Sequence, residues 1–127
     1  MQTKTMIQLA ATLGAMSVGI GAFGAHGLAD ILESTGRTET FETAVKYQFY
    51  HGLAILGCAI LSHQYPGRSD WKWAARLFLV GIIVFSGSLY VLSLTGVTWL
   101  GAITPLGGLA FLMGWGWMAR GASKLNG

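Results

Sequence analysis

The spacing of charged residues is the feature that most constrains how this chain can fold. No Lys, Arg, Asp or Glu occurs in residues 5–29, 47–67 or 77–119. A helix that crosses the hydrocarbon core of a bilayer needs about 20 apolar residues. The first two stretches each have room for one such helix and the third for two, with residues 95–99 as the turn. The sequence therefore predicts an all-α integral membrane four-helix bundle that forms a single domain over residues 1–127. The expected spans are at about 6–26, 47–63, 75–94 and 100–119.

The composition agrees with membrane spans rather than with a soluble domain. Only 10% of the residues are charged and 53% are hydrophobic, whereas soluble domains carry about 25% charged residues. The first stretch has an alternative interpretation as a cleaved signal peptide, because Ala22-Phe23-Gly24 offers small residues for a cleavage site. The stretch is longer than the apolar core of a usual signal peptide, which favours a retained span.

The basic residues predict the orientation of the spans. Lys and Arg concentrate in the cytoplasmic segments of membrane proteins. With four spans, the N-terminal tail, the loop after residue 63 and the C-terminal tail share one side, and they hold six of the eight basic residues. We expect a plasma-membrane protein with both termini in the cytoplasm. Topology accounts for the positive charge, so no nucleic-acid partner is expected. Four Trp residues are expected near the cytoplasmic interface: Trp71, Trp73, Trp115 and Trp117.

The segment between the first two spans predicts a short interfacial helix. Residues 34–36, Ser-Thr-Gly, form a turn signal. After this turn, Thr38 is a suitable N-cap, and Glu39 and Glu42 are favourable near the positive end of a helix dipole. A solvated extension of the second span explains the same pattern and is the alternative.

Small residues predict close contacts between the helices. Ala11, Ala15 and Gly19 repeat every four residues in the first span, and small residues at this spacing let membrane helices approach closely. The fourth span is also rich in glycine. We therefore expect a tight bundle with little room for a wide pore.

A layer of polar residues is expected across the four spans. The rise of a helix places most of these residues at a similar depth in the outer half of the membrane, with Ser86 near the midplane. One interpretation is a hydrogen-bonded network that joins the helices. The other is a small binding site or proton relay, because ionisable groups inside membranes are often functional. The residues of this candidate site are His26, Gln48, Tyr50, His51, Ser86, Tyr90, Thr104 and Pro105.

Cofactor and metal sites are weakly indicated. A haem held by two histidines needs a gap of cofactor size between them, and a tight bundle leaves none between His26 and His51. A metal site at these residues lacks a nearby carboxylate, and Cys58 is the single cysteine. We expect no cofactor and no metal. No nucleophile motif or phosphate-binding loop occurs, so we expect a protein that is not an enzyme.

Four motifs resemble one known family over nearly the whole chain. They are GAFGAHGL at 21–28, TAVKYQFYH at 43–51, FSGSLY at 85–90 and ITPLGG at 103–108. They resemble the small inner-membrane proteins of domain of unknown function 423, which include bacterial YgdD and YwdK and are related to eukaryotic transmembrane protein 256. The resemblance implies a four-span protein of the bacterial inner membrane and no known reaction. The shared motif positions coincide with the polar layer.

Three classes of function remain open from the sequence. We favour an interaction or accessory protein, as a homo-oligomer or as a subunit of a larger membrane complex. The alternatives are a small oligomeric transporter or channel, and a module that binds a lipid or a hydrophobic cofactor through the polar layer. In each case membrane lipids surround the protein.

Overall fold

The computed structural model describes residues 1–127 and contains helices and no strands. Three helices are long and apolar enough to cross a membrane: Thr3–Ala25, Asp70–Thr95 and Thr98–Ser123. The second of these has a π-helical turn in its middle, and the third begins with a 3₁₀ turn. The elements in chain order are α1 (Thr3–Ala25), α2 (Ala29–Thr35), α3 (Thr38–Gln64), α4 (Asp70–Gly81), η1 (Ile82–Ser86), α5 (Gly87–Thr95), η2 (Thr98–Ala102) and α6 (Thr104–Ser123).

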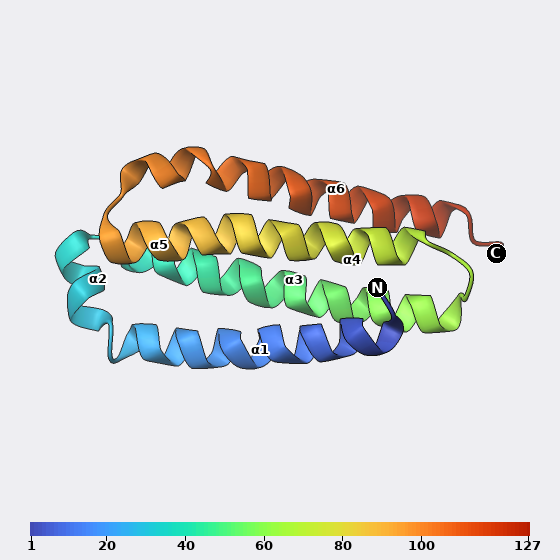
Figure 1. The fold of residues 1–127 in the computed structure, drawn as a ribbon, viewed down its shortest axis with the longest axis horizontal. Helices are drawn as coiled ribbons and strands as arrows, with labels where there is room; N and C mark the ends of the chain where they lie inside the picture. Colours follow the sequence, from blue (N-terminus) through green and yellow to red (C-terminus); the bar gives the residue numbers. More distant parts are fainter.

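The long helices lie side by side along the long axis of the molecule (Figure 1). α1 packs on α3, α3 packs on α4, η1 and α5, and α4 packs on α6. Neighbours in the sequence are therefore neighbours in space, because short connections leave each helix antiparallel to the next. Both termini lie at one end of the molecule and α2 lies at the other.

α3 is the longest helix and the most polar of the long ones. It has 27 residues, and it carries Gln48 and His51, which are only 2% and 5% exposed. A polar side chain in a membrane needs a hydrogen-bonding partner. α3 lies between α1 and α4, so Gln48 and His51 face protein, while Leu53 and Ile60 are exposed on its outer surface.

The segment between α1 and α3 differs from the expectation in detail. A separate short helix forms earlier than predicted, at α2, and it ends at Gly36, whose φ of 67° is the left-handed conformation that glycine adopts readily. Thr38 provides no side-chain cap, so that prediction is wrong. From Thr38 onward the chain is an unbroken part of α3, as in the alternative interpretation.

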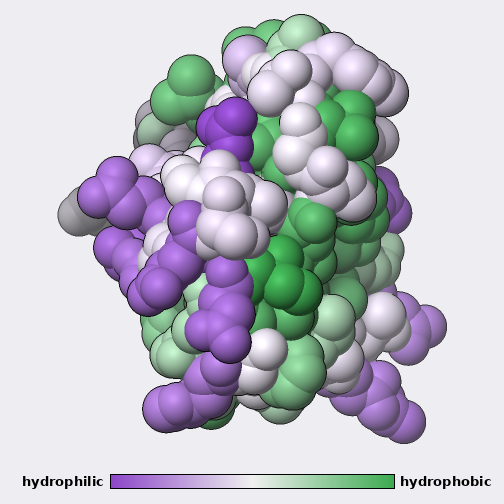
Figure 2. Space-filling view, turned by 90° about the vertical axis from the view of Figure 1, so that its left-hand side faces the viewer, coloured by the Kyte–Doolittle hydropathy of each residue, from purple (hydrophilic) through white to green (hydrophobic).

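Hydrophilic residues cover much of the α2 end of the molecule, with apolar residues between and around them (Figure 2). The hydrophobic core lies toward the opposite end, where the termini are. It is built around large side chains such as Met6 of α1, Ile55 of α3 and Phe78 of α4, each of which is fully buried.

α4, η1 and α6 meet along a seam in which aromatic rings lie on glycines. A Cβ atom at Gly121 would lie 2.6 Å from the Trp71 ring, and one at Gly114 would lie 2.6 Å from the Phe78 ring. A Cβ at Gly107 would collide with the backbone of Phe85. Three aromatic residues and three glycines, each set seven residues apart, therefore face one another in antiparallel register, with rings on Gly121 and Gly114 and the Phe85 backbone on Gly107. We call this contact the ring–glycine seam.

α1 uses only Gly24, near its end, in this way, because a Cβ there would collide with the Phe41 ring of α3. Ala11, Ala15 and Gly19 are exposed, and a Cβ at Gly14 or Gly19 would meet nothing within 4 Å. The expectation that this stripe packs α1 into the bundle is wrong. α1 instead meets α3 through its opposite face, which includes the buried Met6 and Leu13.

Candidate functional site

Gln48 joins three helices through its side-chain amide. Its Nε2 donates to the backbone oxygen of Leu13 in α1 at 3.2 Å, and its Oε1 accepts from the Tyr90 hydroxyl in α5 at 2.7 Å. Both ends of a buried amide are therefore satisfied, which removes the cost of burying it. This arrangement ties the outer helix α1 to the centre of the molecule.

His51 is held in one neutral form by two hydrogen bonds. Its Nδ1 lies 2.8 Å from the backbone oxygen of Tyr47, which can only accept, so Nδ1 carries the proton. Its Nε2 accepts from the indole Nε1 of Trp115 at 3.2 Å. A proton on Nε2 would place two donors face to face, so protonation of His51 would break the contact with α6.

The ring of His51 also belongs to an aromatic cluster. It stacks on Phe111 of α6, with 3.6 Å between ring centroids and 10° between planes. Phe78 of α4 and Tyr47 of its own helix lie against it at 5.5 and 5.9 Å. His51 therefore joins α3, α4 and α6 both by packing and by hydrogen bonding.

Two further members of the predicted layer make contacts between helices. Ser86 is buried in the π-helical turn and donates to the backbone oxygen of Ala44 in α3 at 2.7 Å. Thr104 lies 2.6 Å from the hydroxyl of Ser88, so the start of α6 is bonded to α5. Pro105 lies in the first turn of α6, where no backbone donor is needed, so it starts the helix and does not kink it.

His26 and Tyr50 stand apart from these contacts. His26 is exposed at the end of α1, and its side chain makes no hydrogen bond. Tyr50 is 53% exposed. The idea that His26, Gln48 and His51 share one network is wrong. Helical rise indicates depth but not direction, and the three-residue step between Gln48 and His51 turns them about 60° apart, toward different neighbours.

A groove with mainly apolar walls runs beside His51, between α3 and α6, with a volume of about 800 Å³. We call it the α3–α6 groove. α3 contributes Tyr47, Tyr50 and His51, and η1 contributes Phe85. From α6 come Pro105, Gly108, Leu109, Phe111, Leu112 and Trp115. Trp115 was expected at the cytoplasmic interface but pairs with His51. Trp115 lies four residues after Phe111 and therefore on the same helix face. This spacing is the sequence signal that could have placed Trp115 in one cluster with Phe111.

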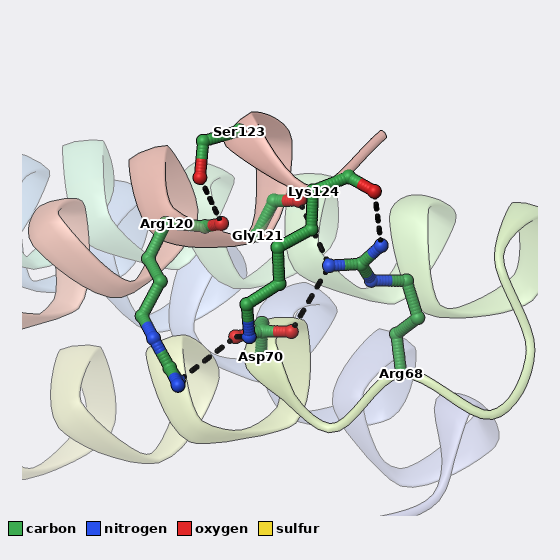
Figure 3. A network of polar contacts seen from close by, with 6 residues as sticks. All are labelled: Arg68, Asp70, Arg120, Gly121, Ser123 and Lys124. Atoms are coloured by element: carbon green, nitrogen blue, oxygen red, sulfur yellow. Dashed lines mark hydrogen bonds and ion pairs between the residues drawn. The ribbon is translucent and has the colours of Figure 1, made fainter. Parts of the chain in front are cut away.

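A second polar group lies at the end that holds the termini (Figure 3). Asp70, which is 5% exposed, accepts from Arg120 at 3.2 Å, from Lys124 at 3.1 Å and from Arg68 at 3.4 Å. Arg68 also donates to the backbone oxygens of Gly121 and Lys124, at 3.2 and 2.9 Å. Carbonyls at the end of a helix lack the regular intrahelical bonds, and here Gly121 accepts only one weak backbone bond, from Lys124 at 3.3 Å. The cluster therefore fastens the end of α6 to the start of α4.

Sequence reasoning missed Asp70 as the shared partner of these cations. It grouped Arg68, Arg120 and Lys124 on one side of the membrane from topology alone. The available signal was a single acidic residue in an otherwise basic loop, at the first position of α4, where a carboxylate is favourable.

Comparison with known proteins decides the family. Residues 20–108 match the family described as "Protein of unknown function (DUF423)". The chain belongs to this family. The matched region runs from the end of α1 to the first turns of α6, so it includes every residue of the candidate polar layer.

Relatives of this DUF423 member are named as membrane proteins. The UPF0382 membrane protein YwdK of Bacillus subtilis is 43% identical over 112 residues, which cover 88% of this chain and 90% of YwdK. The UPF0382 inner membrane protein YgdD of Escherichia coli K12 is 39% identical over 129 residues, covering 99% and 95% of the two chains. A UPF0382 membrane protein of Staphylococcus epidermidis is 48% identical, with 88% and 89% covered. The protein is thus a membrane protein of an uncharacterised family. No solved structure matches the chain.

Proposed function

We propose that this protein is an accessory subunit of the inner membrane, without catalytic activity, that binds an apolar helix of a larger membrane complex. The α3–α6 groove carries the proposal. Its walls are mainly apolar, and the histidine that lines it already bonds Tyr47 and Trp115 through its two ring nitrogens. A side chain whose hydrogen bonds are all made within the chain is suited to joining helices rather than to binding and releasing a substrate.

The composition of the groove favours a helix as its occupant. A Cβ at Gly108 would meet only the edge of the Phe85 ring, at 3.9 Å, so this part of α6 offers a shallow surface. Small residues let the backbone of a second helix approach closely in lipid. Leu109 and Leu112 are 54% and 70% exposed, and they supply apolar side chains for packing on both sides of a docked helix.

The proposed topology has four spans with both termini in the cytoplasm. The length of α3 supports the fourth span, since 27 residues rise about 40 Å, more than the hydrocarbon core. Burial of Gln48 and His51 also supports a fourth span, because their polar side chains then contact protein and not lipid. Six basic residues and one acidic residue lie at the end with the termini, against two basic and four acidic residues at the other. A cytoplasm-dependent fluorescent reporter after Gly127 should be bright, and a periplasmic reporter at Gly36 should be active. The opposite pattern would reject the orientation.

The docking role can be tested by photocrosslinking in cells. A benzophenone amino acid at Leu112 should crosslink to a membrane protein, whereas the same probe at Val18, which is 68% exposed on α1, should not. Gly108→Trp fills the groove and should abolish the crosslink without loss of folded protein. Equal crosslinking from both positions, or a crosslink that survives Gly108→Trp, would reject the groove as the docking site. A crosslink to a second copy would identify a homo-oligomer.

A second function, the binding of a lipid or hydrophobic cofactor, is favoured by one observation. The Tyr50 hydroxyl lies at the groove and makes no hydrogen bond within the chain, so it is free for a polar group on an apolar ligand. Mass spectrometry of the gently purified protein separates the two functions. A stoichiometric small molecule that is absent from Gly108→Trp would support the second function. An oligomer that conducts ions in liposomes would support a transport role instead.

A further inference from the structure

Two tryptophans and two arginines form a stacked group on the flank where α4 and α6 meet, away from the α3–α6 groove. The rings of Trp73 and Trp117 stack with 6.5 Å between centroids and 27° between planes. The guanidinium of Arg76 lies over Trp73, with Cζ 4.8 Å from the ring centroid. That of Arg120 lies over Trp117 at 4.4 Å. We call these four residues the Trp–Arg patch.

The guanidinium groups of the patch are held in place but keep free donors. Stacking of a guanidinium plane on an indole leaves the N–H groups at its edge, where they can bond a planar or tetrahedral anion. Arg76 is exposed and makes no hydrogen bond or ion pair within the chain. The Nη1 of Arg120 pairs with Asp70, and the Arg120 side chain is still 54% exposed. Both arginines therefore have donors directed toward the surroundings.

Positive charge around the patch exceeds what the chain neutralises. Asp70 is the single acidic side chain at this end, and it is shared by Arg68, Arg120 and Lys124 (Figure 3). The other acidic residues lie at the opposite end, in or beside α2 and in the first turns of α3. Arg76 is left without a counter-ion. A cation without a partner at the edge of an apolar surface attracts an external anion.

The surroundings of the patch indicate which anion this is. Trp73 is 47% exposed, and the apolar side chains of Val80 and Met113 are 49% and 48% exposed farther along the same two helices. Arginine and tryptophan together beside an apolar helix surface are typical of the headgroup level of a bilayer. The ligand that fits has a phosphate next to apolar chains and no compensating positive charge.

We propose that the Trp–Arg patch binds an anionic phospholipid. Arg76 and Arg120 donate to its phosphate oxygens, and Trp73 and Trp117 pack on the glycerol and the first carbons of its acyl chains. A zwitterionic lipid carries an ammonium group, which the excess of cations at this end disfavours. The proposal concerns a different surface from the docking groove, so either can fail without the other.

The test is lipid retention by the purified full-length protein in native mass spectrometry, with phosphatidylglycerol and phosphatidylcholine as probes. The wild type should retain phosphatidylglycerol in preference. Arg76→Gln should weaken this retention roughly tenfold, as expected for one charge-assisted contact. Lys4→Gln is the matched control, because Lys4 is exposed in the first turn of α1 and has the same charge but lies outside the patch. It should retain the lipid as the wild type does.

Three results would overturn the proposal. Equal loss in Arg76→Gln and Lys4→Gln would show that diffuse charge, not the patch, attracts the lipid. Equal retention of the two lipids would show that apolar contact alone holds them. Displacement of the lipid by millimolar inorganic phosphate would identify a free anion as the ligand. Arg76→Lys is a second variant that keeps the charge but loses the planar fork, and it should show intermediate retention with an unchanged melting temperature.

Discussion

Close packing on glycine extends along α6 but is confined to one position in α1. In α6, Gly114 and Gly121 each receive an aromatic ring of α4, and Gly107 receives the backbone of Phe85 in η1. In α1, Gly14 and Gly19 face open space, and only Gly24, near the end of the helix, receives a ring, that of Phe41 in α3. The two helices are similarly rich in small residues, so composition does not distinguish them. The difference is whether the adjacent helix offers rings at the matching interval.

This contrast explains where rigidity is built into the molecule. The ring–glycine seam brings backbones close, and its Trp71 and Phe78 rings lie in the buried core, where interdigitated packing is most sensitive to volume. α1 meets α3 mainly through aliphatic side chains, together with one ring, Phe41 on Gly24, and the bond from Gln48 to Leu13. We infer that the α4–α6 pair is the stable unit of the fold and that α1 is the more easily displaced helix.

The largest effect is expected from removal of a ring in the seam. Phe78 is fully buried on Gly114, and Phe78→Ala should cost about 3–5 kcal/mol of unfolding free energy, because it leaves a cavity. The measurement is denaturant unfolding in detergent micelles. Trp99→Ala, at a site that is 65% exposed, should change little. Similar losses in both variants would contradict the seam as the stable unit.

The next largest effect comes from a single methyl group. Gly107→Ala directs its Cβ into the backbone of Phe85, which cannot rotate away, and it should destabilise the fold by about 1–3 kcal/mol. Gly116→Ala on the same helix meets nothing within 4 Å and should stay within about 0.5 kcal/mol of the wild type. If Gly107→Ala proved neutral in thermal unfolding, the close approach of the two backbones would be in error.

A smaller effect is expected where α3 meets α1 and α5. Tyr90→Phe removes the donor to Gln48 Oε1, and hydrogen bonds within membranes contribute about 0.6 kcal/mol on average and about 1.7 at most. A double-mutant cycle with Gln48→Leu should show coupling, because the two side chains share this bond. His26→Ala and His51→Ala should instead add within about 0.5 kcal/mol. Coupling between the two histidines would restore the single network that the structure rejects.

The smallest effect is expected on the open face of α1. Gly14→Ala adds a methyl group in free space, so the unfolding free energy should change by no more than about 0.5 kcal/mol. The informative measurement is the oligomeric state in detergent, by light scattering. A change of oligomer without a change of stability would mean that this face contacts another chain and is not open to lipid.

The positions of the helices follow closely from the charge pattern. The expected spans at 47–63 and 75–94 lie wholly inside a continuous helix, the first span runs one residue beyond α1, and the fourth begins in η2 and continues in α6. The turn expected at residues 95–99 includes Gly96, which has a φ of 72°. The expected spans are shorter than the helices, because helices continue past the apolar region. α4 begins at Asp70 and α3 begins at Thr38, both before the expected span.

The side-chain partners could not be derived in the same way. Depth follows from counting residues, and it grouped Gln48, His51 and Tyr90 at a similar level. Direction around the helix depends on which helix packs where, and the charge pattern contains no information on that. Gln48 therefore bonds Tyr90 while His51 bonds Trp115, a residue that the topology and the preference of Trp for membrane interfaces had assigned to the interface.

The seven-residue interval of the ring–glycine seam restricts how the chain can change in length. One residue added or deleted between Trp71 and Phe85, or between Gly107 and Gly121, would rotate every later position by about 100° and move each ring off its glycine. Substitutions leave this alignment intact. Insertions are tolerable in the hairpin only between the two matched series, around residues 96–103, where the connection is exposed. The matched spacing therefore fixes the number of residues in each arm of the α4–α6 hairpin.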